Sequence, residues 1–67
     1  MDKMTLQDFI RDMGDGRAAA LFGVKERTAA SWRRGERFPR AQDIPRMIEL
    51  SGGRLEYASF FHGRDAA

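Results

Sequence analysis

The sequence predicts a small all-α domain. Apolar residues recur at helical spacing, as in the first segment, where Leu6, Phe9, Ile10 and Met13 fall at i, i+3, i+4 and i+7. Glycines separate five such segments, as they often do where helices end. The chain has 67 residues and no cysteine, so it forms one domain at most, without a disulfide or a thiolate metal site. We therefore expect one five-helix domain over residues 1–67, with residues 62–67 as a disordered tail.

The first two predicted helices are short and closely spaced. Thr5 is placed to cap the first helix, because its hydroxyl can accept a hydrogen bond from the first turn, and Gly14 suits the end of that helix. The second helix is expected over about residues 16–22, with Asp15 as its N-cap and Gly23 after its end. This segment is rich in alanine, so another helix can pack closely over it.

The later segments are delimited by glycine and proline. A third helix is expected to end at Gly35. Pro45 is compatible with a fourth helix if Asp43 is its N-cap, because proline is tolerated in a first turn. The last segment, "RLEYASFFHG" at residues 54–63, fits both a helical turn and the alternation of a strand, so it predicts either a fifth helix or a short strand.

Positive charge gathers in the middle of the chain. Between Arg11 and Arg40 there are eight basic and four acidic residues, a net charge of +4, whereas the rest of the chain carries −2. Ten of the twelve basic residues are arginines, whose guanidinium group can contact phosphate or guanine with two hydrogen bonds. Such clustering indicates an anionic partner, although solvated helix surfaces are also often charged.

The third helix has one apolar side and one basic side. If Ala29 and Trp32 point inward, the opposite side is set by the advance of about 100° per residue. That outer side carries donors, a hydroxyl and a methyl group, contributed by Arg27, Ala30, Ser31 and Arg34, with Glu26 and Arg33 on the flanks. A helix that enters the major groove of DNA needs such a side. A short helix, a tight glycine turn and a helix of this kind together make a helix-turn-helix.

From Thr5 to about Tyr57, the chain resembles the Cro/C1-type helix-turn-helix proteins of bacteria and their phages. The stretches "TLQDFIRDMG" and "RAAALFGV" resemble the start of phage Cro proteins. "GVKERTAASWRRG" resembles their turn and recognition helix, and "FPRAQDIPRMIELSGGRLEY" resembles the fourth helix and tail of the all-helical Cro proteins. The family's small, turn and core positions are matched by Ala19, Gly23, Val24, Ala29 and Trp32.

The sequence departs from the family pattern near the expected DNA-reading positions. Lys25 stands where Ser or Thr usually caps the recognition helix, and Glu26 stands where Gln is common. Ala30 replaces a polar residue, and the pair Asp15-Gly16 replaces polar donors at the start of the second helix. These departures concern the base-reading pattern rather than the fold.

The resemblance implies double-stranded DNA as the partner, and the residues expected to make contacts fall into three groups. Base contacts are expected from Glu26, Arg27, Ala30 and Ser31. Phosphate contacts are expected from Arg17, Lys25, Arg33, Arg34, Arg37 and Arg40. The aromatic residues Phe38, Tyr57, Phe60 and Phe61 are expected to form a dimer surface, and the alternative is that the last three close the monomer core.

The expected function is sequence-specific transcriptional regulation by a Cro-like repressor, which binds a palindromic operator as a weak homodimer. The alternative is a protein-interaction module, such as an antitoxin or adaptor component. We do not expect an enzyme, because the chain has no cysteine, one histidine and no serine with a nearby base. Neither a cofactor, a metal nor a small-molecule ligand is expected. Acidic residues from Asp2 onward argue against a signal peptide, and no apolar run could span a membrane, so a cytoplasmic location is expected.

Overall fold

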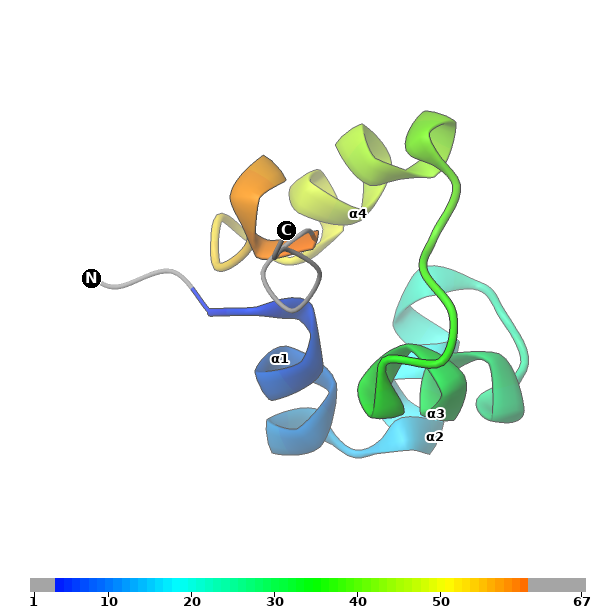
Figure 1. Ribbon diagram of the computed structural model, residues 1–67. Coiled ribbons are helices and arrows are strands. Elements are labelled where there is room, and N and C mark those ends of the chain that lie inside the picture. The colour runs from blue at the N-terminus through cyan, green and yellow to red at the C-terminus, as the bar shows by residue number, and fades with distance from the viewer. Residues whose placement is uncertain (1–3, 61–67) are drawn as a thin grey trace.

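The computed structural model describes residues 4–60, which contain four α-helices, two short 3-10 turns and no strand (Figure 1). The elements in chain order are α1 (Leu6–Met13), α2 (Asp15–Phe22), α3 (Glu26–Arg34), η1 (Ala41–Asp43), α4 (Ile44–Leu50) and η2 (Tyr57–Phe60). The prediction of an all-α fold is confirmed. The predicted fifth helix is a 3-10 turn of four residues instead, and the strand alternative is wrong. Phe61, His62 and the predicted tail lie outside the described residues.

The helix ends follow from local hydrogen bonds. Thr5 caps α1 as predicted, because its Oγ1 accepts a hydrogen bond from the Asp8 backbone N–H over 3.0 Å. Gly14 follows α1 with a φ of 100°, a conformation that favours glycine. Gly23 and Gly35 end α2 and α3 in the left-handed region, with φ values of 73° and 78°. The glycines therefore set the lengths of the first three helices.

Of two further predicted N-caps, Asp15 is wrong and Asp43 is confirmed in position. Asp15 is the first residue of α2 rather than its N-cap, and its side chain makes no capping hydrogen bond. Asp43 does occupy the N-cap position of α4 with Pro45 in the first turn, but its side chain does not cap either. The 3-10 turn η1 ends at Asp43 and α4 begins at Ile44, so the chain is already helical before α4 starts.

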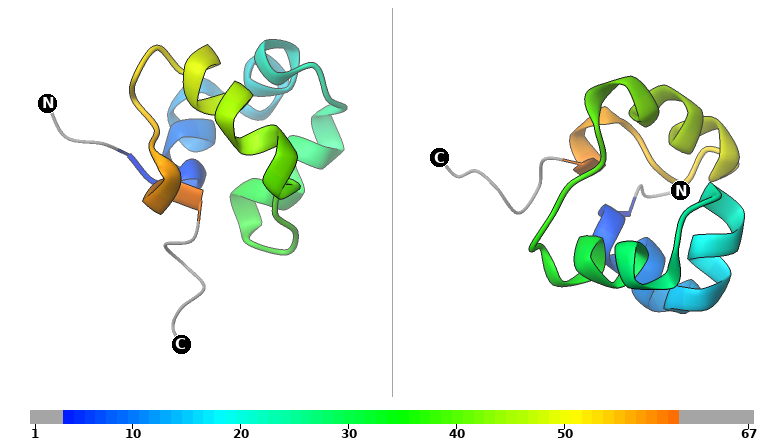
Figure 2. Two further views of the ribbon diagram at one scale, coloured as in Figure 1. Left: turned by 90° about the horizontal axis from the view of Figure 1, so that it is seen from above. Right: turned by 90° about the vertical axis from the view of Figure 1, so that its right-hand side faces the viewer.

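The helices form two parts around one core. In Figure 1, α1, α2 and α3 lie together, whereas α4 and η2 lie above them. Figure 2 shows the long loop after α3 crossing from one part to the other along one side of the molecule. The core between the parts consists of Leu6, Phe9, Ile10, Ala18, Ala19, Phe22, Ala29, Trp32, Ile44, Met47, Leu55 and Phe60. Its aromatic centre is the series Phe9, Phe22 and Trp32, with successive ring centroids 5.8 and 6.3 Å apart.

The segment after α4 folds back tightly and closes the core. Ser51 Oγ donates to the Ile48 carbonyl over 2.6 Å and accepts from the Leu55 N–H over 3.1 Å. Ser59 Oγ accepts from the Glu56 N–H over 3.0 Å. These side-chain bonds replace helical backbone bonds, and they favour a turn over a further α-helix. The turn places Phe60 in the core with only 2% of its surface exposed, so the expectation that it lies on an exposed dimer surface is wrong.

The two ends of the described chain are joined. The Met4 N–H donates to the Arg54 carbonyl over 3.0 Å, and the Arg54 guanidinium lies 5.1 Å from the centre of the Phe9 ring. The same guanidinium pairs with Asp12 at 3.2 Å. Arg54 thus links α1 to the segment that leads into η2. Within residues 4–60, no helix is long and apolar enough to cross a membrane.

Candidate nucleic-acid interface

The sides of α3 are arranged as the sequence predicts. Ala29 and Trp32 are buried, with 0% and 7% of their surfaces exposed. On the outer side, Arg27 and Arg34 are exposed, and Ala30 and Ser31 are partly exposed. The buried pair holds α3 against the core, so the outer side keeps a defined orientation.

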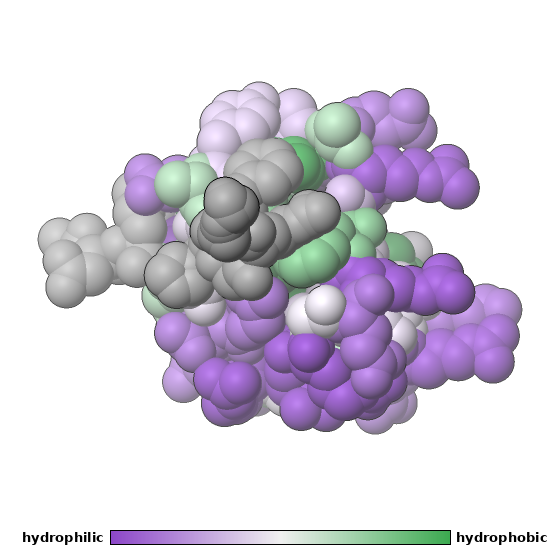
Figure 3. Space-filling view, in the orientation of Figure 1, coloured by the Kyte–Doolittle hydropathy of each residue, from purple (hydrophilic) through white to green (hydrophobic). Residues whose placement is uncertain are grey.

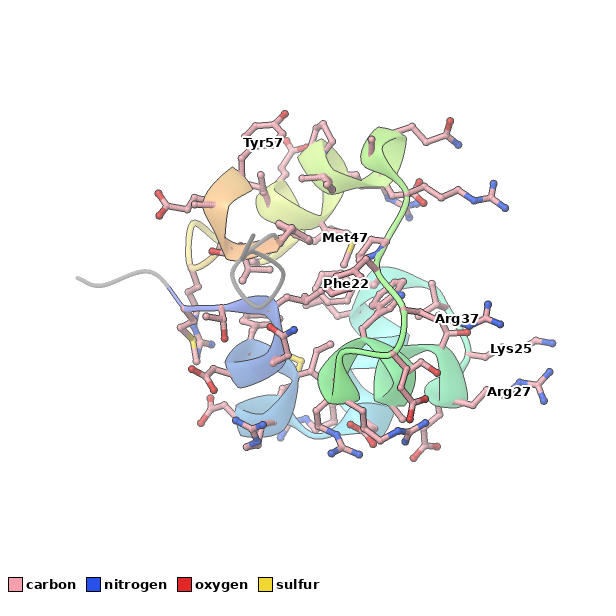
Figure 4. The ribbon with its side chains drawn as sticks, in the orientation of Figure 1. Phe22, Lys25, Arg27, Arg37, Met47 and Tyr57 are labelled. Atoms are coloured by element: carbon pink, nitrogen blue, oxygen red, sulfur yellow. The ribbon has the colours of Figure 1, made fainter. Side chains whose placement is uncertain are left out.

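A basic groove runs between α3 and the loop that follows it. It encloses about 800 Å³ and is lined by Lys25, Arg27, Thr28, Ser31, Trp32, Arg34, Arg37, Phe38, Pro39, Arg40 and Asp43. Five of these residues are cationic and one is acidic. Figure 4 shows Lys25, Arg27 and Arg37 extending outward on the same side of the molecule. The hydrophilic side chains in Figure 3 also gather on this side and around the lower part formed by α1 to α3.

Two of the predicted phosphate contacts already have carboxylate partners. Arg33 forms two hydrogen bonds with Asp15, from Nε to Oδ1 over 2.8 Å and from Nη2 to Oδ2 over 3.1 Å. Arg34 pairs in the same way with Glu36, over 3.0 and 3.1 Å. The hydrogen bond from Arg33 lowers the pKa of Asp15, and that from Arg34 lowers the pKa of Glu36, so both carboxylates stay charged. Sequence periodicity did not indicate either pair.

The remaining predicted phosphate contacts are exposed cations. Arg17, Lys25, Arg37 and Arg40 are exposed, as is the predicted base contact Arg27. None of the four ion pairs found within residues 4–60 involves these side chains. Their charged groups can therefore contact an anion without first breaking a short ion pair.

Glu26 is directed toward the second helix. A Cβ atom built on Gly16 would lie 3.7 Å from the Glu26 carboxylate, so this carboxylate packs against the first turn of α2. A negative charge at that end of a helix is favourable. The position supports a structural role for Glu26 beside the base contact predicted for it.

The structure does not bring the predicted dimer residues into one patch. Phe38 is half-buried in the basic groove, beside α3. Tyr57 is 58% exposed on η2, in the other part of the molecule (Figure 4). The other large hydrophobic residue exposed in that part is Leu50 of α4, at 36%, which the sequence analysis did not predict as a dimer residue. Phe60 is in the core, and Phe61 lies outside the described residues.

No group of three or more His, Cys, Asp or Glu residues in the described part of the chain could hold a metal ion. Comparison of the chain with protein-family models, with curated proteins and with solved structures finds no match.

Proposed function

We propose that this protein is a sequence-specific DNA-binding transcriptional regulator, a Cro-like repressor of the Cro/C1 helix-turn-helix type. The observation that carries the proposal is the basic side of α3 over a buried Ala29 and Trp32, continued by the cations of the adjoining loop. In this proposal α2, the Gly23 turn and α3 are the helix-turn-helix, and α3 enters the major groove.

The chemistry of the groove lining fits a nucleic-acid backbone and base edges. An α-helix fits the major groove of B-DNA, where arginine can hold O6 and N7 of guanine with two hydrogen bonds. Arg27 and Ser31 are the polar residues of α3 that we assign to base edges. Lys25, Arg37 and Arg40, which line the groove, are assigned to phosphates, which set the register of the helix on the duplex.

One helix in one groove gives little contact area, so we include a homodimer on a palindromic operator in the proposal. A protein-interaction module, such as an antitoxin or adaptor component, is the alternative. The concentration of unpaired cations on one side favours DNA, because their long-range attraction suits a polyanion.

The test is to select duplexes from a random pool and measure their affinity as a function of salt. With the three phosphates assigned to Lys25, Arg37 and Arg40 neutralised in each protomer, the log–log slope should be about −3 per protomer, from roughly −0.9 for each phosphate. An enriched sequence with such a slope supports the proposal. An affinity that does not change with salt, together with no enriched sequence, would reject it in favour of the interaction module.

A further inference from the structure

The ion pair between Asp15 and Arg33 joins the start of α2 to the end of α3, which are the two helix ends that the turn at Gly23 does not connect. The turn connects the last residue of α2 to the first residue of α3. Asp15 is the first residue of α2, and Arg33 lies in the last turn of α3. Among the ion pairs that the structure describes over residues 4–60, this is the one between these two helices.

The pair has a fixed geometry. The planar guanidinium faces the carboxylate with two parallel hydrogen bonds of 2.8 and 3.1 Å, an arrangement that restricts rotation as well as distance. The two side chains are only 32% and 22% exposed, less than those of the other three pairs. Each charge also lies at the helix end whose dipole favours it.

The apolar contact between α2 and α3 does not by itself fix the angle between the two helices. The residues that α2 and α3 bury are three alanines and two aromatic rings: Ala18, Ala19, Ala29, Phe22 and Trp32. An alanine allows close approach but has no side-chain volume beyond Cβ to interlock with a neighbour. The ring contact at 6.3 Å is one anchor, and the Asp15–Arg33 pair is a second anchor made by different chemistry.

We propose that Asp15 and Arg33 are positioning residues, which hold α3 at the angle to α2 at which Arg27 and Ser31 meet the base edges. This inference rests on the proposed function. It removes Arg33 from the predicted phosphate contacts, and it makes the Asp15–Arg33 pair a determinant of sequence specificity that does not touch DNA. This proposal explains the departure from the family pattern at Asp15, because the carboxylate binds Arg33 between the helices instead of contacting the DNA backbone.

A rival account gives the pair a different effect. If Asp15 only neutralises Arg33, its removal frees a cation for a phosphate. Affinity would then rise for every DNA sequence, and the salt dependence would become steeper by about 0.9. If the pair positions α3, its removal instead lowers the preference for the selected sequence and leaves the salt slope unchanged.

The experiment compares Asp15→Asn with the matched control Glu36→Gln. Glu36 pairs with Arg34 in the same bidentate manner, but the two residues are two positions apart and do not join helices. Residual dipolar couplings of the free protein would measure the angle between α2 and α3. Dissociation constants for a selected and a scrambled duplex would be measured over a range of salt concentrations, at a temperature where circular dichroism shows each variant folded.

Asp15→Asn should change the angle and lower the ratio of the two affinities by about tenfold, within the range that one mismatched base pair costs. Arg33→Lys, which keeps the charge but not the two parallel bonds, should change the angle in the same direction. Glu36→Gln should leave both the angle and the ratio unchanged. An unaltered angle in Asp15→Asn, or tighter binding of both duplexes with a steeper salt slope, would overturn the inference. If the wild-type protein selects no duplex, the proposed function fails, and the couplings alone decide whether the pair positions α3.

Discussion

The arginines on and around α3 differ in what lies within reach of their guanidinium groups. Arg33 and Arg34 each meet a carboxylate through two hydrogen bonds, whereas Arg27 and Arg37 form no ion pair within the described residues. Arg27 projects from the first turn of α3, and Arg37 projects from the loop on the other side of the basic groove. Residues of one type therefore have three expected roles: base contact, phosphate contact and link between elements.

Replacing Arg27 and Arg37 separately should distinguish the first two roles. Arg27→Ala should cost about 1–3 kcal/mol at one base pair of each half-site and relax the preference there. Arg37→Ala should weaken binding to all sequences about equally and reduce the salt slope by about 0.9. Competition binding with single-base variants of a selected duplex would measure both effects. A uniform loss of affinity in Arg27→Ala would identify it as a phosphate contact and move base reading elsewhere on α3.

At the level of the helices, α2 and α3 are joined by an ion pair whose contribution to stability depends on pH. The hydrogen bond from Arg33 lowers the pKa of Asp15 below its ordinary value of 3.8. A carboxylate with a lowered pKa stabilises the folded state at pH values above its unfolded pKa, and this stabilisation is lost as the pH falls through the folded value. Glu36 behaves in the same direction, from an ordinary value of 4.5, because of Arg34. The link between α2 and α3 is thus complete at neutral pH.

Thermal unfolding of Asp15→Asn across pH should reveal this link. The variant should melt at a lower temperature than the wild-type protein at pH 7, since it lacks the charged partner of Arg33. The difference should shrink below pH 3.8 and vanish once Asp15 of the wild-type protein is protonated. Differential scanning calorimetry at several pH values would measure it. A difference that persists undiminished at pH 2 would show that Asp15 stabilises the fold through something other than its charge.

The turn η2 matters to stability more than its length suggests. It brings Phe60 into the core with 2% exposure, among the largest fully buried side chains. Phe60→Ala should destabilise the fold by about 3–5 kcal/mol, the usual cost of removing a buried ring. A domain of this size has only about 3–10 kcal/mol in total, so much of the protein should unfold.

Chemical denaturation followed by circular dichroism would measure the loss, with Tyr57→Ala as the control. Tyr57 lies three residues away in the same turn but is 58% exposed, so its replacement should leave stability nearly unchanged. Equal destabilisation by the two variants would contradict the burial that distinguishes them.

At the level of the whole molecule, the sequence predicted what local patterns determine. Apolar periodicity and glycines gave the all-α class, four of the helices and the inward side of α3, because these depend on neighbouring residues. The pairing of Asp15 with Arg33 joins residues 18 positions apart, and it depends on how two helices cross. Phe60 was similarly ambiguous, because three aromatic residues close together do not indicate which ring a turn will bury. Such features require the tertiary arrangement.

The exposed hydrophobic residues indicate which part of the molecule forms the dimer surface. Two recognition helices on successive turns of DNA lie about 34 Å apart, so a dimer on a palindromic operator must hold its two α3 helices at that separation. Tyr57 and Leu50 are the large hydrophobic residues exposed among residues 4–60, and both lie in the part of the molecule formed by α4 and η2. We therefore expect a weak homodimer through this part, which binding to two half-sites strengthens by linkage.

The double variant Leu50→Ala, Tyr57→Ala should reduce both self-association and operator affinity while its helix content stays that of the wild-type protein. Truncating Tyr57, which is 58% exposed, costs the monomer little, whereas Leu50 is only 36% exposed, so its truncation also lowers stability. Assembly is therefore compared at a temperature where both proteins are folded, and there the two truncations remove apolar area from the dimer interface. Sedimentation velocity with and without a palindromic duplex would measure assembly, and circular dichroism would check folding. As a control, Arg37→Ala should weaken DNA binding without changing self-association in the absence of DNA. If the double variant associates as strongly as the wild-type protein, the dimer surface lies elsewhere, and Phe38 beside the basic groove becomes the next residue to replace.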